Sequence, residues 1–224
     1  MEKRLLSRLI DHRVLQHPDA LSDERLMDVL LQRRFISMIF TPVYDMGIDA
    51  LSTQAALDVA REIVREEYPA GKPSHREDLI RDLVALGATK HQILACRPTP
   101  STTSMLVETL ELMGEAAAGG DEVRVLGMLR FWGEVVVAVE YGQFWKALAP
   151  HFSTEERPSR FYQTHHRHDG CEPLATASAK THSGRLGVCL RELLITPNTA
   201  DAVSQLEARI VESRLRFYDQ FLDS

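Results

Sequence analysis

The sequence predicts an all-α protein in a single domain. Apolar residues recur at intervals of three and four rather than two, and the breaks between apolar segments carry residues that cap helices. No stretch shows the sustained alternation, flanked by hairpin turns, that β-strands would give. The 224 residues contain no internal repeat, low-complexity tract or linker that would divide them. We therefore expect one helical domain over residues 1–224.

Capping residues and breakers set the expected helices in order. Ser74 and Glu77 have capping-box spacing, and Thr99-Pro100 and Thr196-Pro197 each place a cap residue before a proline. Glycines at 119–120 and the segment 153–158 each separate two helices. About eight helices result, joined by short loops. They are expected over about 22–40 and 52–68, from 74, from 99 to 118, from 121 to the break at 153, from 161 to about 169, from 174 to 194, and from 197 onward.

Composition excludes several classes of protein. The net charge of −6 is modest and spread along the chain, so no basic face for nucleic acid is expected. No apolar run approaches the ~20 residues that span a membrane, and the N-terminus is too polar for a signal peptide. The three cysteines are an odd number at irregular spacing, which favours a reducing compartment and hence the cytoplasm.

An acid occupies a core-facing position in the helix before the turn at 69–73. Glu67 continues the apolar stripe of Ala60, Ile63 and Val64, whereas Glu66 falls about a hundred degrees away and is expected in solvent. A core-facing carboxylate is costly unless something pairs with it. For Glu67 alone, contact with water or an arginine near the helix end is the simpler explanation.

A second acid lies in the segment 128–140, which is apolar on nearly every side and should form a central helix. Glu134 is in its middle. An ordinary salt bridge with Arg130, one turn earlier, is the simpler interpretation of Glu134 alone. Glu140 lies nearer the helix end, where an acid is less costly.

The segment 161–173, FYQTHHRHDGCEP, is the richest in polar side chains. His165 and Asp169 are four residues apart, so on a helix both point to one side, with His168 and Glu172 bordering the same stripe. Histidine nitrogen and carboxylate oxygen together suit iron, manganese or zinc. A solvated helix face is the alternative.

The helix expected over 174–194 follows an interruption at Pro173. On it His182 shares the apolar stripe of Leu186 and Leu190, and a hydrogen-bonded core histidine is the usual explanation for such a residue. The simpler explanations given for Glu67, Glu134, His165 and His182 become weaker when the four residues are considered together. Several helices would then direct an acid or a histidine toward the same interior. Two ferrous ions would supply the missing positive charge.

The order of these residues resembles the heme-oxygenase-like superfamily, which includes thiaminase II and the pyrroloquinoline-quinone synthase. Within it the chain looks most like the diiron oxidases and oxygenases typified by the chlamydial death-receptor-binding protein and alkene-forming decarboxylases. Residues 66–79 are similar to the family's succession of an acid, a short loop, a histidine and a helix, and residues 97–100 look like its proline-rich turn. The resemblance covers about residues 15–194.

Two further motifs carry the resemblance. Gly133-Glu134, followed by Tyr141 and Leu148, resembles the family's central helix with its glutamate ligand. The segment from Phe161 to Asp169 is similar to the start of the family's last ligand motif, His-x-x-x-Asp-x-x-His.

The resemblance implies that two irons are bound. At the place of the family's final histidine this sequence has Glu172, so three alternatives stay open: Glu172 is the sixth ligand, His182 takes its place, or the second metal is weakly held. We favour His182 because it lies on the apolar stripe. The expected metal ligands are Glu67, His75, Glu134, His165, Asp169 and His182.

We therefore expect a cytoplasmic oxidoreductase with two Fe(II) per chain and O2 as co-substrate. The resemblance implies desaturation, fragmentation or N-oxygenation of a small amino-acid-like molecule in a biosynthetic pathway, with an external electron donor and a homodimer. The main alternative is a metal-free relative, either a thiaminase-like hydrolase or a cofactor-independent oxidase. Cys171 is then the only plausible nucleophile, because Cys96 and Cys189 look structural. A third is a non-enzymatic partner-binding protein, for which we expect an exposed apolar stripe and see none.

Overall fold

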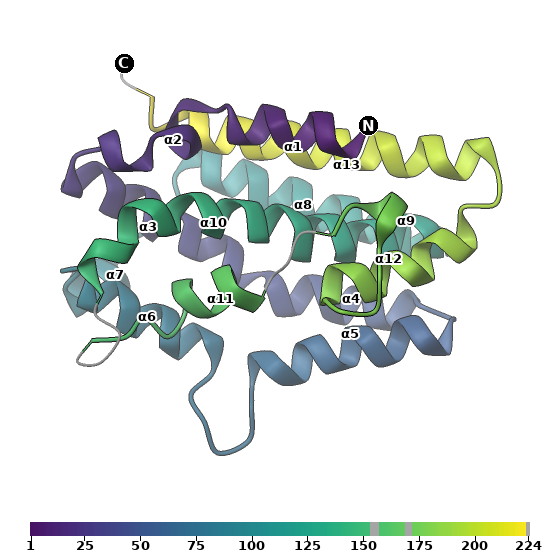
Figure 1. The fold of residues 1–224 in the computed structure, drawn as a ribbon, viewed down its shortest axis with the longest axis horizontal. Helices are drawn as coiled ribbons and strands as arrows, with labels where there is room; N and C mark the ends of the chain where they lie inside the picture. The colour runs from purple at the N-terminus through teal and green to yellow at the C-terminus, as the bar shows by residue number, and fades with distance from the viewer. Residues whose placement is uncertain (153–156, 169–171, 223–224) are drawn as a thin grey trace.

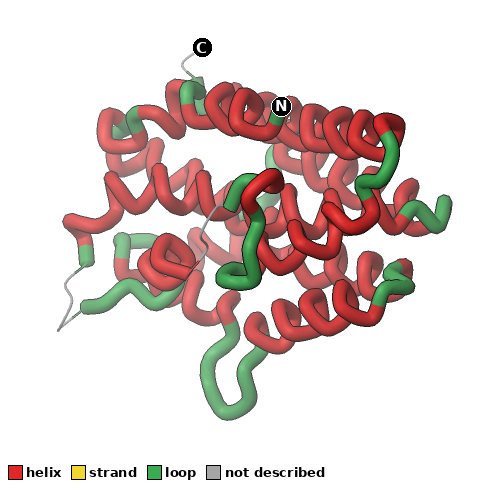
Figure 2. Tube along the Cα trace, turned by 45° about the vertical axis from the view of Figure 1, so that its right-hand side comes forward, coloured by secondary structure: helices red, strands yellow, loops and turns green. Residues whose placement is uncertain are grey.

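The computed structural model describes residues 1–152, 157–168 and 172–222 of the chain. Helices joined by loops make up this part, and no strand occurs within it (Figure 2). Of the described residues, 78% are helical. The prediction of an all-α, single-domain bundle is confirmed.

The helices are α1 (Glu2–Ile10), α2 (Arg13–Gln16), η1 (Pro18–Ala20), α3 (Asp23–Met38), α4 (Phe40–Ala50), α5 (Gln54–Glu67), α6 (His75–Ala85), α7 (Lys90–Ala95), α8 (Pro100–Ala118), α9 (Glu122–Arg130), η2 (Phe131–Val135), α10 (Val136–Leu148), η3 (Ala149–His151), α11 (Tyr162–His168), η4 (Leu174–Thr176), α12 (His182–Leu193) and α13 (Pro197–Asp219).

The long helices lie in layers (Figure 1). α1 and α13 pack together along one edge of the molecule, and α5 and α6 form the opposite edge, joined by a loop that projects outward. Between the edges, α9 packs against α4, α8, α12 and α13. α11 lies against α10 on the face turned toward the viewer. Among the described residues, none of the helices combines the length and apolar character that crossing a membrane requires.

The predicted capping signals act where the sequence places them. Ser74 and Glu77 form a reciprocal capping box at the start of α6. Thr99 and Thr196 each accept a hydrogen bond from the backbone of the first turn, and a proline follows each as the first residue of α8 and α13. These three helix starts are therefore fixed by local side-chain chemistry.

The predicted central helix is interrupted at its middle. The segment 128–140 runs through the end of α9, the π-helical turn η2 and the start of α10, and every residue of η2 is buried. A π-helical turn is wider than an α-helical one and re-aims the side chains that follow it. Glu134 lies within this turn.

The helix predicted over 174–194 is wrong in its first half. Only the short turn η4 forms there, and α12 begins at His182 with Thr181 as its cap. The carboxylate of Glu172 accepts hydrogen bonds from the Ser178 backbone (2.8 Å) and the Thr181 hydroxyl (2.8 Å). Side-chain bonds of this kind compete with helix formation, which explains the late start.

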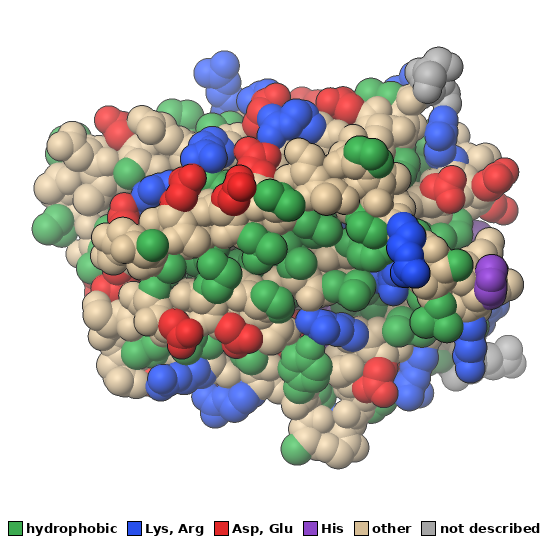
Figure 3. All heavy atoms as spheres, turned by 180° about the vertical axis from the view of Figure 1, so that it is seen from behind, with side chains coloured by type: hydrophobic (Ala, Val, Ile, Leu, Met, Phe, Trp, Pro, Cys, Tyr) green, Lys and Arg blue, Asp and Glu red, His purple; other side chains and the backbone are tan. Residues whose placement is uncertain are grey.

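The face seen from behind Figure 1 carries hydrophobic side chains across its middle, with charged side chains around them (Figure 3).

Candidate functional site

A cavity of about 870 Å³ opens between α3, α5, α6, α11 and the η2–α10 segment. Its apolar wall includes Phe40, Trp132 and Phe161. Five of the six predicted metal ligands line it, each from a different helix. They are Glu67 at the end of α5, His75 at the start of α6, Glu134 in η2, His165 in α11 and His182 at the start of α12.

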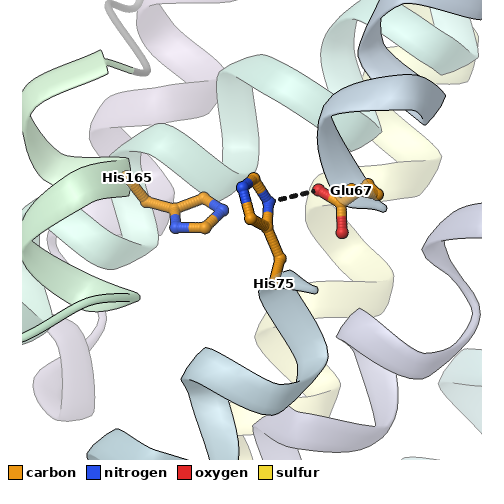
Figure 4. A group of neighbouring side chains, drawn as sticks. All are labelled: Glu67, His75 and His165. Atoms are coloured by element: carbon orange, nitrogen blue, oxygen red, sulfur yellow. Dashed lines mark hydrogen bonds and ion pairs between the residues drawn. The ribbon is translucent and has the colours of Figure 1, made fainter. Parts of the chain in front are cut away.

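Three of these side chains form a close group (Figure 4). His75 lies between Glu67 and His165, and each of the three offers a ligand atom within 4.8 Å of the other two. The Nδ1 atom of His75 is 2.8 Å from Oε1 of Glu67, and the two histidine rings meet edge to face with centroids 4.9 Å apart. This arrangement could hold a cation. That it binds a metal stays a prediction.

Local sequence explains how Glu67 and His75 meet. α5 ends at Glu67, and two prolines, Pro69 and Pro73, keep the following loop from continuing the helix. The capping box then starts α6 at His75. The two side chains are eight residues apart in sequence and face each other across this loop.

His165 is a neutral imidazole with one unprotonated ring nitrogen. Its Nδ1 atom lies 2.7 Å from the Phe161 carbonyl oxygen, and since a carbonyl only accepts, Nδ1 carries the proton and Nε2 keeps its lone pair. Burial and the neighbouring His75 lower the pKa of His165 to about 4. For His75, burial acts in the same direction, but the hydrogen bond and charge of Glu67 outweigh it and raise the pKa.

A buried acid from α6 fixes α11, and with it His165. Asp82 accepts a hydrogen bond from the Ser159 hydroxyl (2.6 Å) and from the backbone N–H groups of Arg160 (3.0 Å), Phe161 (3.0 Å) and Tyr162 (3.2 Å). The three backbone donors are the free N–H groups at a helix N-terminus, which a carboxylate satisfies well. α11 is thereby attached to the helix that carries His75.

Glu134 is buried, and among the described residues no arginine or lysine forms an ion pair with it. Its Oε1 atom accepts a 2.5 Å hydrogen bond from Tyr44, and its Oε2 atom lies 3.7 Å from Nδ1 of His182. Burial raises the pKa of Glu134, although the charge of His182 opposes this. The Arg130–Glu134 salt bridge is not formed: Arg130 instead pairs with Glu2 through both terminal nitrogens.

His182 belongs to a second group, with Glu62 and Glu66, whose ligand atoms also lie within 4.8 Å of one another. Its Nε2 atom is 3.5 Å from Oε2 of Glu66. Glu62 is held by a bidentate ion pair with Arg185, with both distances 2.8 Å. Glu66 is exposed, as predicted, yet it lines the cavity, which the helical pattern did not indicate.

Three further residues singled out in the sequence are Asp169, Cys171 and Glu172. Asp169 and Cys171 lie outside the described residues. The carboxylate of Glu172 is engaged by the loop before α12, so of the two alternatives for the sixth ligand only His182 lines the cavity.

The sequence analysis missed a buried charge network beside the cavity. Arg33, which lines the cavity, donates to Glu140 through Nε (2.8 Å), and Arg214 lies 3.5 Å from the other carboxylate oxygen. Glu140 is fully buried, contrary to the expectation of a tolerant position near a helix end. Arg33 had a readable signal, because it continues the apolar stripe of Leu26 and Val29 on α3.

Comparisons with known proteins find likeness at the level of fold. No protein-family model matches the chain, and no curated protein matches it. Among solved structures, a TenA family transcription regulator from Silicibacter sp. is 16% identical with a TM-score of 0.66, covering 100% of this chain and 93% of that one. A TenA homolog from Pseudomonas syringae is 12% identical with a TM-score of 0.70 (98% and 88% covered), and a TenA homologue from P. horikoshii is 14% identical with a TM-score of 0.60 (98% and 93%). The chain has the helical fold of these proteins.

Proposed function

We propose that the cavity is the active site of an iron-dependent enzyme that oxidises a small amino-acid-like molecule with O2. The observation that supports this proposal is the convergence of Glu67, His75, Glu134, His165 and His182, from five helices, on one cavity. Asp169 is proposed as a further ligand.

The donor set fits iron. Carboxylate oxygens and imidazole nitrogens are the ligands that ferrous and ferric ions take in helical bundles. His165 is neutral and presents Nε2. Glu134 is buried, and in the described part of the chain no arginine or lysine pairs with it, only the Tyr44 hydroxyl and the His182 imidazole. A buried carboxylate without a counter-charge is costly, and a bound cation removes that cost.

When bound, ferrous iron would supply the activation of dioxygen, with electrons from an external donor. The protein binds and orients the substrate. Lys72, Arg160 and Lys180 are exposed at the cavity, and none has an ion-pair partner within the described residues. They suit a substrate carboxylate, while the apolar wall of Phe40 and Trp132 holds the substrate body and excludes water.

A metal-free, thiaminase-like hydrolase is the second candidate. The comparisons favour it, because the three similar structures are TenA proteins. Its difficulty is the nucleophile: no cysteine lines the described part of the cavity, and burial raises the pKa of both Cys96 and Cys189. Glu134, whose pKa is raised by burial, would then serve as an acid or base.

Anaerobic titration with ferrous iron separates the two candidates. The proposal expects two irons per chain, a loss of iron in His165→Ala, and no loss in His91→Ala, an exposed histidine on α7 that lies outside the cavity lining. Oxygen consumption is then followed with a panel of amino acids. Absence of iron uptake together with hydrolysis of thiamine would establish the second candidate and reject the first.

A further inference from the structure

We infer that Tyr44 is a positioning residue for Glu134, and that Gly133 is the residue that leaves room for it. The inference rests on the proposed function, because it concerns how Glu134 is presented to a metal ion. It adds a second residue of α4 to the site, because Phe40 already lines the cavity whereas Tyr44 does not.

Tyr44 controls one of the two oxygen atoms of Glu134. The tyrosine is fully buried, and its hydroxyl donates to Oε1 of Glu134 at 2.5 Å while lying 3.2 Å from the Leu129 carbonyl oxygen. A distance of 2.5 Å is at the short end of hydroxyl–carboxylate bonds, which are stronger than bonds between neutral groups. With Oε1 engaged, the carboxylate has Oε2, on the side of His182, for another partner.

Gly133 holds the tyrosine ring in this position by having no side chain. A Cβ atom at residue 133 would lie 2.9 Å from both Cε2 and the hydroxyl oxygen of Tyr44, closer than such contacts occur. The ring is rigid and is stacked against Phe40 with centroids 4.4 Å apart, so relief would require the hydroxyl to move relative to Glu134.

The backbone conformation at Gly133 and Glu134 also helps to orient the Glu134 carboxylate. Gly133 and Glu134 both belong to the π-helical turn η2, which sets the direction of the carboxylate. Groups that hydrogen-bond to a metal-binding side chain orient it, and their loss typically weakens metal binding by about 10- to 100-fold. A tyrosine that only filled the core would have no such effect, since Tyr44→Phe keeps the ring.

The test is an anaerobic titration of the metal-free chain with Co²⁺, followed by its visible absorption. Tyr44→Phe and Gly133→Ala are each expected to weaken Co²⁺ binding by about 10- to 100-fold. Gly114→Ala is the matched control: Gly114 also faces α4, but its added Cβ would meet only the Met46 methyl at an ordinary 3.5 Å. It should bind as the unchanged chain does.

The double variant Tyr44→Phe/Glu134→Gln shows whether Tyr44 acts through Glu134. It should bind Co²⁺ no more weakly than Glu134→Gln alone, because the two residues act through one contact. If circular dichroism shows that Tyr44→Phe fails to fold, Gly133→Ala and its control decide the question.

Two results would overturn the inference, and they are distinguishable. Weaker binding in Glu134→Gln, with wild-type binding in Tyr44→Phe and Gly133→Ala, would reject the role of Tyr44 and leave the proposed function standing. Absence of Co²⁺ and Fe²⁺ uptake by the unchanged chain would reject both.

Discussion

Replacing Asp82 by alanine tests how α11, and therefore His165, is held in place. The change removes the one carboxylate that accepts from the Ser159 hydroxyl and from three consecutive backbone N–H groups, those of residues 160–162. Asp82 is 2% exposed, so water does not replace it without local opening. We expect α11 to detach before the rest of the bundle unfolds.

The size of the effect follows from these contacts. A hydrogen bond to a charged group contributes about 1.5–3 kcal/mol, and simple addition over four donors would give about 6–12 kcal/mol. The donors are adjacent and their contributions overlap, and Arg160 is exposed, so its N–H can be rehydrated. Each buried donor left unsatisfied costs about 1–3 kcal/mol, so for these overlapping contacts we expect the free energy of unfolding to fall by about 3–5 kcal/mol.

Urea denaturation measures the change in the free energy of unfolding. Hydrogen exchange of the amides of residues 160–162 measures how far the start of α11 opens locally. Asp78→Ala is the control on the same helix, because Asp78 has an ion pair with the half-exposed Arg81, worth about 0–1 kcal/mol. A loss in Asp82→Ala no greater than in Asp78→Ala, with those amides still protected, would refute the assignment of Asp82 as the anchor of α11.

Three further changes probe charges elsewhere. Burial, with the charge of Glu2, raises the pKa of Glu207 from 4.5 to about 7. The stability that the protonated acid contributes is therefore complete below pH 4.5 and is lost as the pH rises through 7, a fall of at most about 3 kcal/mol. In urea denaturation at about pH 5 and about pH 8, Glu207→Gln should reduce this difference in the free energy of unfolding. Glu140→Gln leaves two buried arginines without a counter-charge and should lower the free energy of unfolding by about 3–5 kcal/mol at pH 7, whereas a change below 1 kcal/mol would contradict that pairing. Under the proposed function, Lys180→Ala should raise the KM for a carboxylate substrate up to about fivefold with kcat unchanged, and high salt should abolish the difference.

Sequence reasoning succeeded where the signal is local. The start of α6 follows from Ser74 and Glu77, whose capping box needs only four consecutive residues. The helical stripe likewise indicated that Glu67 and His182 turn inward, and both line the cavity. These signals depend on backbone geometry within one helix, which the chain specifies without reference to distant segments.

Interactions between helices could not be read in this way. Arg33 and Glu140 are 107 positions apart, and Tyr44 and Glu134 are 90 apart, so periodicity within a helix says nothing about either pair. The π-helical turn was missed for a related reason: a single widened turn leaves the apolar pattern of 128–140 almost unchanged. The late start of α12 depends on the carboxylate of Glu172, which residue spacing alone presented as a possible metal ligand.

Glu134 and Glu140 are two buried acids of the central segment, and they differ in the charged groups beside them. Glu140 is paired with Arg33 and approached by Arg214, so the chain itself neutralises it. Glu134 is 6% exposed, yet within the described residues it has only the neutral hydroxyl of Tyr44 and the imidazole of His182. A buried carboxylate in that setting either keeps a proton, as the raised pKa allows and a metal-free enzyme would use, or binds a cation. The proximity of Glu67, His75 and His165 in the same cavity favours the cation, because nitrogen and oxygen donors on several helices can share it, whereas a lone protonated acid would not require them.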